Sequence, residues 1–216
     1  MSFQNLVQAT QKYFPQLQIK YKTESTLMSW LGKLLFFNPG FMSSYTTTIG
    51  SDVYYPNKQF VKTRPISAAI ILLHEIVHMY DSKRLSKLWF GFSYLLPQIL
   101  ALLFIPLMFV SWKIALPFLV LGAPIPAFFR MYYEKRAYFA SLYVMNALGK
   151  RLKFDPMLDK QKAYFEDQFT GSFYYFMWPF SGLKKDFDVA VDKINAGQRP
   201  YEDPVFDILD ELTAQV

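Results

Sequence analysis

Two histidines and a glutamate stand together in the stretch His74-Glu75-Ile76-Val77-His78. Histidines four residues apart on an α-helix project from the same face, one turn apart, so both imidazoles can reach one metal ion. A glutamate between them is the residue type that takes a proton from a zinc-bound water. The chain of 216 residues contains only two histidines, and both lie here. The spacing predicts a Zn²⁺ site with Glu75 as general base; the alternative is a chance match of two core or surface histidines.

The third zinc ligand has to come from outside this motif. A catalytic zinc ion normally takes three protein ligands and one water. Since the chain has no cysteine and no further histidine, the third ligand is expected to be a carboxylate. Asp81 is nearest along the helix, but it lies about 10 Å beyond His74 and its side chain is short. We expect Asp81 instead to bond a ligand histidine or to pair with a basic neighbour such as Arg84.

Glu134 is the favoured third ligand. It lies on the first helix expected after a long apolar segment, where a helix would fold back beside the zinc helix. The alternative for Glu134 is an ion pair with Arg130, one turn earlier. Glu166 and Asp167 are weaker candidates, because no pattern around them supports metal binding.

A His-Glu-x-x-His helix followed by a glutamate on a later helix resembles the gluzincin metallopeptidases. An apolar hairpin between these two elements is similar to the HtpX-type and CAAX prenyl protease membrane peptidases, whose third ligand lies in a Glu-x-x-Ala-Asp pattern. This chain has Glu134-Lys135-Arg136-Ala137-Tyr138, so Tyr138 stands where the aspartate would bond a ligand histidine. The strand-like run from Thr47 to Tyr54 before the zinc helix is closer to the compact minigluzincins.

The resemblance covers roughly residues 45 to 140. It implies zinc-dependent cleavage of peptide bonds, with Asp81 and Tyr138 behind the metal ligands. It also implies that the strand would pair with an extended peptide substrate. The residues expected at that substrate edge are Thr48, Ile49, Gly50 and Ser51.

A long apolar segment occupies residues 88 to 129. Its first part, Leu88 to Val110, carries no charge and is long enough to cross a hydrocarbon core of about 30 Å. Ser111-Trp112-Lys113 interrupts the segment, and an uncharged, proline-broken second part follows. The pattern predicts a hydrophobic helical hairpin with a polar tip, inserted into a single domain of residues 1 to 216. The alternative is a hairpin buried in a large core or against partner subunits.

Basic residues flank this segment on both sides: Lys83, Arg84 and Lys87 before it, and Arg130, Lys135 and Arg136 after it. By the positive-inside rule, we expect a membrane protein whose termini and zinc helix lie on the cytoplasmic side. The net charge is +6, but no stacking platform or recognition helix accompanies the basic clusters, which argues against nucleic acid as a partner. The N-terminus lacks the basic start and apolar core of a secretory signal.

The fold class expected from these patterns is α+β and mostly helical, a zincin-like core with a small sheet. Strands are expected within residues 16–21 and 45–55, the latter as one strand or as a hairpin bent at Gly50-Ser51. Helices are expected over residues 3–14, 27–37, 65–83, 130–150, 155–167, 184–195 and 204–214.

The function that these features predict is a membrane-associated endopeptidase acting on a peptide or protein substrate. A tyrosine hydroxyl would stabilise the negative charge of the transition state, and Tyr174 or Tyr175 in the aromatic run 169–180 is the candidate. Core or interface packing is the alternative role for that run. The second class of function is a membrane-inserting structural or delivery component of a larger assembly, such as a virion or secretion machine, with a vestigial or structural zinc site.

Overall fold

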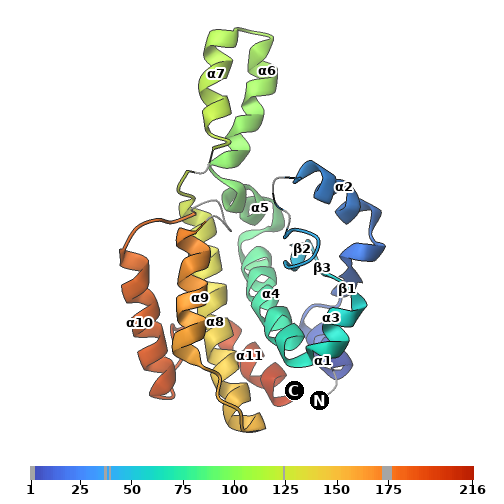
Figure 1. Cartoon of the computed structure of the whole chain (residues 1–216), viewed down its shortest axis with the longest axis vertical. Helices are drawn as coiled ribbons and strands as arrows, with labels where there is room; N and C mark the ends of the chain where they lie inside the picture. Colours follow the sequence, from blue (N-terminus) through green and yellow to red (C-terminus); the bar gives the residue numbers. More distant parts are fainter. Residues whose placement is uncertain (1–2, 37, 39, 124, 172–176) are drawn as a thin grey trace.

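The computed structural model describes residues 3–36, 38, 40–123, 125–171 and 177–216. It is mostly helical with one small sheet, as the α+β class predicts (Figure 1). In chain order the elements are α1 (Phe3–Tyr13), β1 (Gln18–Tyr21), the 3-10 helix η1 (Lys22–Glu24), α2 (Thr26–Leu34), β2 (Thr47–Ile49), β3 (Asp52–Tyr55), α3 (Lys58–Thr63), α4 (Pro65–Leu85), α5 (Lys87–Leu95), the 3-10 helix η2 (Gln98–Leu103), α6 (Phe104–Met108), α7 (Trp112–Val120), α8 (Phe128–Leu152), α9 (Leu158–Thr170), α10 (Gly182–Asn195) and α11 (Val205–Ala214).

The sheet has three strands in the order β1-β3-β2. β1 runs parallel to β3, and β2 runs antiparallel to β3 with Thr48 opposite Val53. The hairpin bend expected at Gly50-Ser51 is confirmed, since these two residues link the paired Ile49 and Asp52. Gly50 has φ +64°, a left-handed conformation that a two-residue hairpin loop requires and that glycine adopts without a Cβ clash. β2 is therefore an edge strand beside the buried β3.

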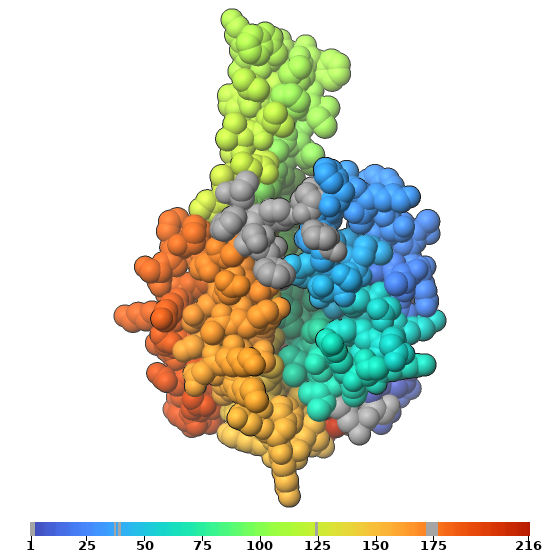
Figure 2. All heavy atoms as spheres, in the orientation of Figure 1, coloured from blue at the N-terminus to red at the C-terminus, as the bar shows by residue number. Residues whose placement is uncertain are grey.

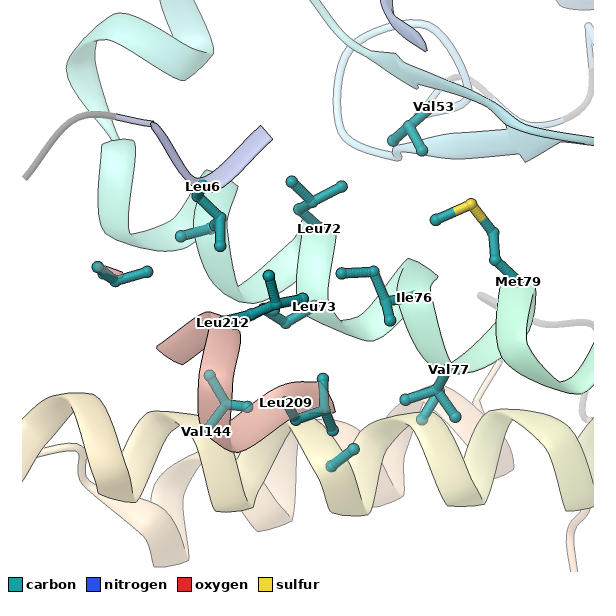
Figure 3. Packing of buried hydrophobic residues seen from close by; sticks show 14 of the residues in the cluster. Leu6, Val53, Leu72, Leu73, Ile76, Val77, Met79, Val144, Leu209 and Leu212 are labelled. Atoms are coloured by element: carbon teal, nitrogen blue, oxygen red, sulfur yellow. The ribbon is translucent and has the colours of Figure 1, made fainter. Parts of the chain in front are cut away.

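α4 is the helix around which the rest of the body packs. Pro65 at its start suits a helix N-terminus, where the missing N–H would have no partner. The helix is buried on several sides, because the sheet covers one side and α8 and α11 cover another (Figure 3). Each fully buried leucine, such as Leu72 or Leu73, contributes roughly 2 kcal/mol relative to an exposed one. This burial fixes the position of the histidine-bearing helix.

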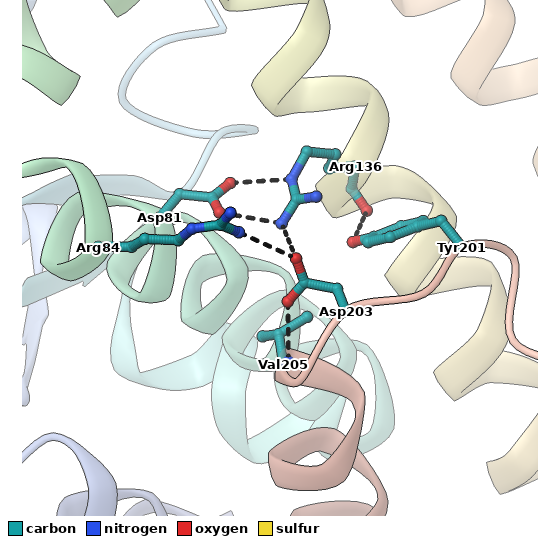
Figure 4. Close-up of polar contacts among 6 residues, drawn as sticks. All are labelled: Asp81, Arg84, Arg136, Tyr201, Asp203 and Val205. Atoms are coloured by element: carbon teal, nitrogen blue, oxygen red, sulfur yellow. Dashed lines mark hydrogen bonds and ion pairs between the residues drawn. The ribbon is translucent and has the colours of Figure 1, made fainter.

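A buried ionic cluster joins α4 to α8 (Figure 4). Arg136 of α8 donates two hydrogen bonds to Asp81 of α4, from Nε at 3.2 Å and from Nη2 at 3.0 Å. The same Nη2 donates to Asp203 at 3.0 Å, and Asp203 also accepts the backbone N–H of Val205 at the start of α11. The cluster therefore ties α4, α8 and the segment before α11 together.

This cluster answers the expectation for Asp81. The Asp81 side chain pairs with Arg136, which lies 55 residues further along the chain. It does not bond His74 or His78, as one of the two expectations had it. Arg84, the basic neighbour considered from the sequence, reaches Asp203 at 3.4 Å instead. A bidentate guanidinium fork matches a carboxylate better than a lysine could, and both groups are buried here.

The first part of the apolar segment, Leu88 to Val110, is bent and does not form one straight helix. α5 ends at Leu95, shortly before Pro97, whose ring cannot be accommodated in a continuing helix, and the Gln98–Met108 segment leaves α5 at an angle of 86°. The projecting hairpin consists of η2, α6 and α7 only, and it stands clear of the body (Figures 1 and 2). Among the described residues no single helix has the length and apolar character to cross a membrane; α5 and the bent segment after it meet those criteria only as a pair.

The Asp81–Arg136 pair generates a first prediction. Replacing Arg136 by Ala leaves the buried carboxylate of Asp81 without its partner and that of Asp203 with Arg84 only, so we expect the free energy of unfolding in urea to fall by about 3–5 kcal/mol. The control is Lys58→Ala, which removes an exposed ion pair with Glu24. That change is expected to cost at most about 1 kcal/mol. Equal losses for the two variants would contradict the role assigned to Arg136.

Candidate metal centre

Three potential metal ligands converge between α4 and α8. His74 and His78 come from one face of α4, and Glu134 comes from the facing turn of α8; one ligand atom from each lies within 4.8 Å of the others. The two Nε2 atoms are 3.2 Å apart, and each lies 3.5 Å from an oxygen of Glu134. A tetrahedral zinc ion with ligand distances near 2.1 Å needs ligand atoms about 3.4 Å apart. The separations therefore fit one small divalent cation.

Ser141 orients the first histidine. Its Oγ donates to the carbonyl of Ala137 at 2.9 Å and so accepts from Nδ1 of His74 at 3.1 Å. This arrangement puts the imidazole proton on Nδ1 and leaves the Nε2 lone pair facing His78 and Glu134, as a metal ligand requires. The role of Ser141 was not predicted from the sequence. The only pattern that indicates it is its position seven residues, or two turns, after Glu134 on the same helix.

Two tyrosines contact the ligands. Tyr94 of α5 donates a hydrogen bond from its hydroxyl to Oε1 of Glu134 at 2.5 Å. The other oxygen, Oε2, is buried, lies 3.5 Å from Nε2 of His74 and makes no hydrogen bond within the described part of the chain, as expected of a carboxylate oxygen that is free to bind a metal. Tyr138 packs the edge of its ring against His74 with ring centroids 4.8 Å apart. Tyr94 was missed because its segment looked uniformly apolar.

Glu134 makes no ion pair with Arg130, the alternative considered from the sequence. The Arg130 guanidinium instead donates to the carbonyl of Tyr94 at 3.2 Å and to the side chain of Gln98 at 3.3 Å. Arg130 thus holds the bend between α5 and η2, and Glu134 is left to the histidines and Tyr94.

The electrostatics of the cluster favour a positive charge between the three ligands. Burial alone would raise the pKa of Glu134, but the charge of His78 and the closeness of both imidazoles lower it far below its ordinary value. Burial likewise would lower the pKa of His78, yet attraction to Glu134 raises it to about 9. A divalent cation would supply the same positive charge between the three side chains, and its binding would displace a proton from the cluster.

Glu75 lies on α4 between the two histidines and is half-buried. It makes no hydrogen bond or ion pair with the part of the chain that the structure describes. A carboxylate in this state is available to accept a proton from a bound water.

A buried charge that the sequence does not predict belongs to Lys22, which interacts electrostatically with Glu75. Its side chain is fully buried, and Nζ donates to the carbonyl of Phe41 at 2.5 Å. Burial lowers the pKa of Lys22 to about 8, against the opposing attraction of Glu75. Nothing in the sequence marks this lysine, because lysines beside short strands are ordinarily exposed.

The predicted substrate residues lie on the sheet, in two different settings. Thr48 and Ile49 belong to the edge strand β2, whereas Gly50 and Ser51 form its turn. The turn lines a cavity of about 460 Å³ together with residues of α4 and α5, and none of the three metal ligands is part of that lining. Gly50 and Ser51 therefore face a cavity apart from the metal ligands, and β2 with Thr48 and Ile49 is left as the candidate for pairing with a substrate.

The remaining candidates fall outside the cluster. Glu166 and Asp167 lie on α9 and are not part of the group that could hold a metal among the described residues. Tyr174 and Tyr175, the candidates for stabilising the transition state, lie outside the described residues.

No protein-family model, no curated protein and no solved structure matches this chain. The resemblance to gluzincins accordingly rests on the short zinc motif and on the geometry described above.

The contacts behind the ligands generate a second prediction. Ser141→Ala and Tyr94→Phe each remove a group that orients a ligand, and we expect each to weaken zinc binding about 10- to 100-fold, measured by competition with a chromogenic chelator. The matched control is Tyr133→Phe, because Tyr133 is buried nearby but bonds Ser93. If Tyr133→Phe lost as much zinc affinity as Tyr94→Phe, the loss would reflect disturbed packing and not the hydrogen bond to Glu134.

Proposed function

We propose that this protein is a membrane-associated, zinc-dependent endopeptidase of the gluzincin type. The observation that carries the proposal is the convergence of His74, His78 and Glu134, with Glu75 on the same helix making no hydrogen bond or ion pair to any described residue. A purely structural zinc site has no need of a free carboxylate beside its ligands. A hydrolytic site does need one, because the attacking water has to lose a proton.

The residues divide the chemistry as follows. Zinc, when bound, supplies a Lewis acid that lowers the pKa of a water and polarises a carbonyl. His74, His78 and Glu134 would hold it, with Ser141 and Tyr94 fixing two of these side chains. Glu75 would take the proton of the attacking water and later deliver it to the leaving amine nitrogen.

The edge strand β2 supports a peptide as the substrate. It pairs with β3 on one side, and no other described strand pairs with its second backbone edge, where an added strand would bind. Main-chain pairing of this kind binds an extended peptide with little dependence on its side chains. An endopeptidase acting on extended segments fits this arrangement.

A second candidate function is supported by a different observation. The projecting hairpin exposes large apolar side chains, including Phe109 at 89%. A membrane-inserting component of a larger assembly would need such an element and no catalysis. In that case the metal would only join α4 to α8, and replacing Glu75 would be without consequence.

Metal analysis of the purified protein provides the third prediction. We expect about one zinc per chain, lost in Glu134→Gln and retained in Glu166→Gln, a matched change on α9. Unfolding curves have to show that Glu134→Gln is still folded. A wild-type protein that stays empty when zinc is offered would end the enzyme proposal.

The fourth prediction separates the two functions. Glu75→Gln should keep its zinc and lose peptide hydrolysis by about 10²- to 10⁴-fold, because the general base is removed while the ligands are unchanged. The measurement is cleavage of an unstructured protein substrate, with Glu166→Gln as the active control. Equal cleavage by wild type and Glu75→Gln would refute the assigned base.

A further inference from the structure

The projecting hairpin has an apolar surface that the protein itself does not cover. At its tip Phe109 is 89% exposed and Val110 is 75% exposed. The other exposed apolar side chains along η2, α6 and α7 are Leu102, Leu103, Ile105, Met108, Trp112, Ile114, Leu116, Leu119 and Val120. Exposed apolar side chains in this number mark a protein or membrane interaction site.

A second set of exposed apolar residues lies at the root of the hairpin. On α5 the set comprises Leu88, Trp89, Phe92 and Leu95, and on α2 it comprises Leu27, Trp30 and Leu34. α2 lies at the same end of the molecule as the root of the hairpin (Figure 1). Tryptophans on both helices are the residue type that prefers the boundary between lipid headgroups and acyl chains.

The charge distribution separates this end from the rest of the molecule. Residues 25–51 and 82–133 contain no aspartate and no glutamate, and together they include α2, α5 and the whole hairpin. The charged residues in these two stretches are all basic: Lys33, Lys83, Arg84, Lys87, Lys113 and Arg130. Lys113 follows the tip, whereas the other five lie on the helices at the root of the hairpin. An apolar surface with cations at its base is complementary to an anionic bilayer, whose phosphates attract lysine and arginine.

The dimensions favour insertion into one leaflet. The six residues of η2 and five of α6 extend roughly 20 Å, against about 30 Å for the whole hydrocarbon core. α5 is turned by 86° from this direction, so it would lie along the bilayer surface while the hairpin enters it. One leaflet, about half of the core, is within reach of the hairpin.

We propose that this end of the molecule docks onto an anionic lipid bilayer, with the hairpin inserted into one leaflet and α2 and α5 lying at the headgroup level. We refer to the residues of α2, α5 and the hairpin named above as the docking face. Docking of this kind specifies which surface of the protein binds, the charge of the lipid and the depth of insertion. It does not depend on the proposed peptidase activity.

Flotation with lipid vesicles tests the docking face directly. The full-length protein should float with vesicles of phosphatidylcholine mixed with phosphatidylglycerol and much less with phosphatidylcholine alone. Phe109→Asp places a charge at the inserted tip and should lower the partition coefficient about a hundredfold. Val189→Asp is the matched control, since Val189 is 45% exposed on α10, away from the docking face, and this variant should float like the wild type.

The basic residues are tested by a double change. Lys83→Gln with Lys87→Gln should lower binding to the anionic vesicles on the order of tenfold and leave binding to phosphatidylcholine unchanged. Glu75→Gln should float like the wild type, so a failed peptidase assay and a failed docking assay remain distinguishable.

Fluorescence quenching by brominated lipids tests the depth. In single-tryptophan variants, Trp112 should be quenched most by bromines deep in the acyl chains. Trp30 and Trp89 should be quenched most by bromines near the headgroups. Equal flotation of wild type and Phe109→Asp would overturn the proposal. The proposal would also be overturned if the wild type did not bind vesicles but formed an oligomer, and Phe109→Asp dissociated that oligomer. The hairpin would then be a subunit interface.

Discussion

The bidentate contact between Arg136 and Asp81 sets the distance and rotation of α4 relative to α8, and the metal centre depends on both. Asp81 lies less than one turn after His78, and Arg136 lies two residues after Glu134. Because an ionic fork tolerates little misalignment, it fixes the register in which the carboxylate meets the imidazoles. Apolar packing around Leu73 and Val77 brings the two helices together, and the ion pair selects one arrangement among those that packing alone would allow.

Much of the helical framework can be read from the sequence because local patterns dictate it. The period of apolar residues and Pro65 gave the start of α4, and two residues with turn propensity gave the bend between β2 and β3. The meeting of His74 and His78 follows from helix geometry alone. The proximity of Glu134 required one further assumption, that the chain folds back after the apolar segment, and the structure has this arrangement.

The errors arose where a tertiary contact decides the role of a residue. Asp81 looked like a partner for a histidine or for Arg84, but its partner is 55 residues distant in sequence. Tyr94 carries no local signal and Ser141 only its spacing from Glu134, since the role of a hydroxyl in an apolar run depends on a hydrogen-bond partner that is distant in sequence. The bend within residues 88 to 110 was not predicted, because hydropathy measures composition and does not register a change of direction at Pro97.

α5 belongs to two surfaces at once. On one side Phe90 and Tyr94 face His78 and Glu134, and on the other side Trp89 and Phe92 are exposed. A helix of nine residues cannot shift on one side without moving the other. A cation held by His74, His78 and Glu134 and a bilayer bound at the docking face would therefore act on the same rigid body and share a coupling free energy. By thermodynamic reciprocity, any gain in metal affinity that anchoring produces equals the gain in anchoring that the metal produces.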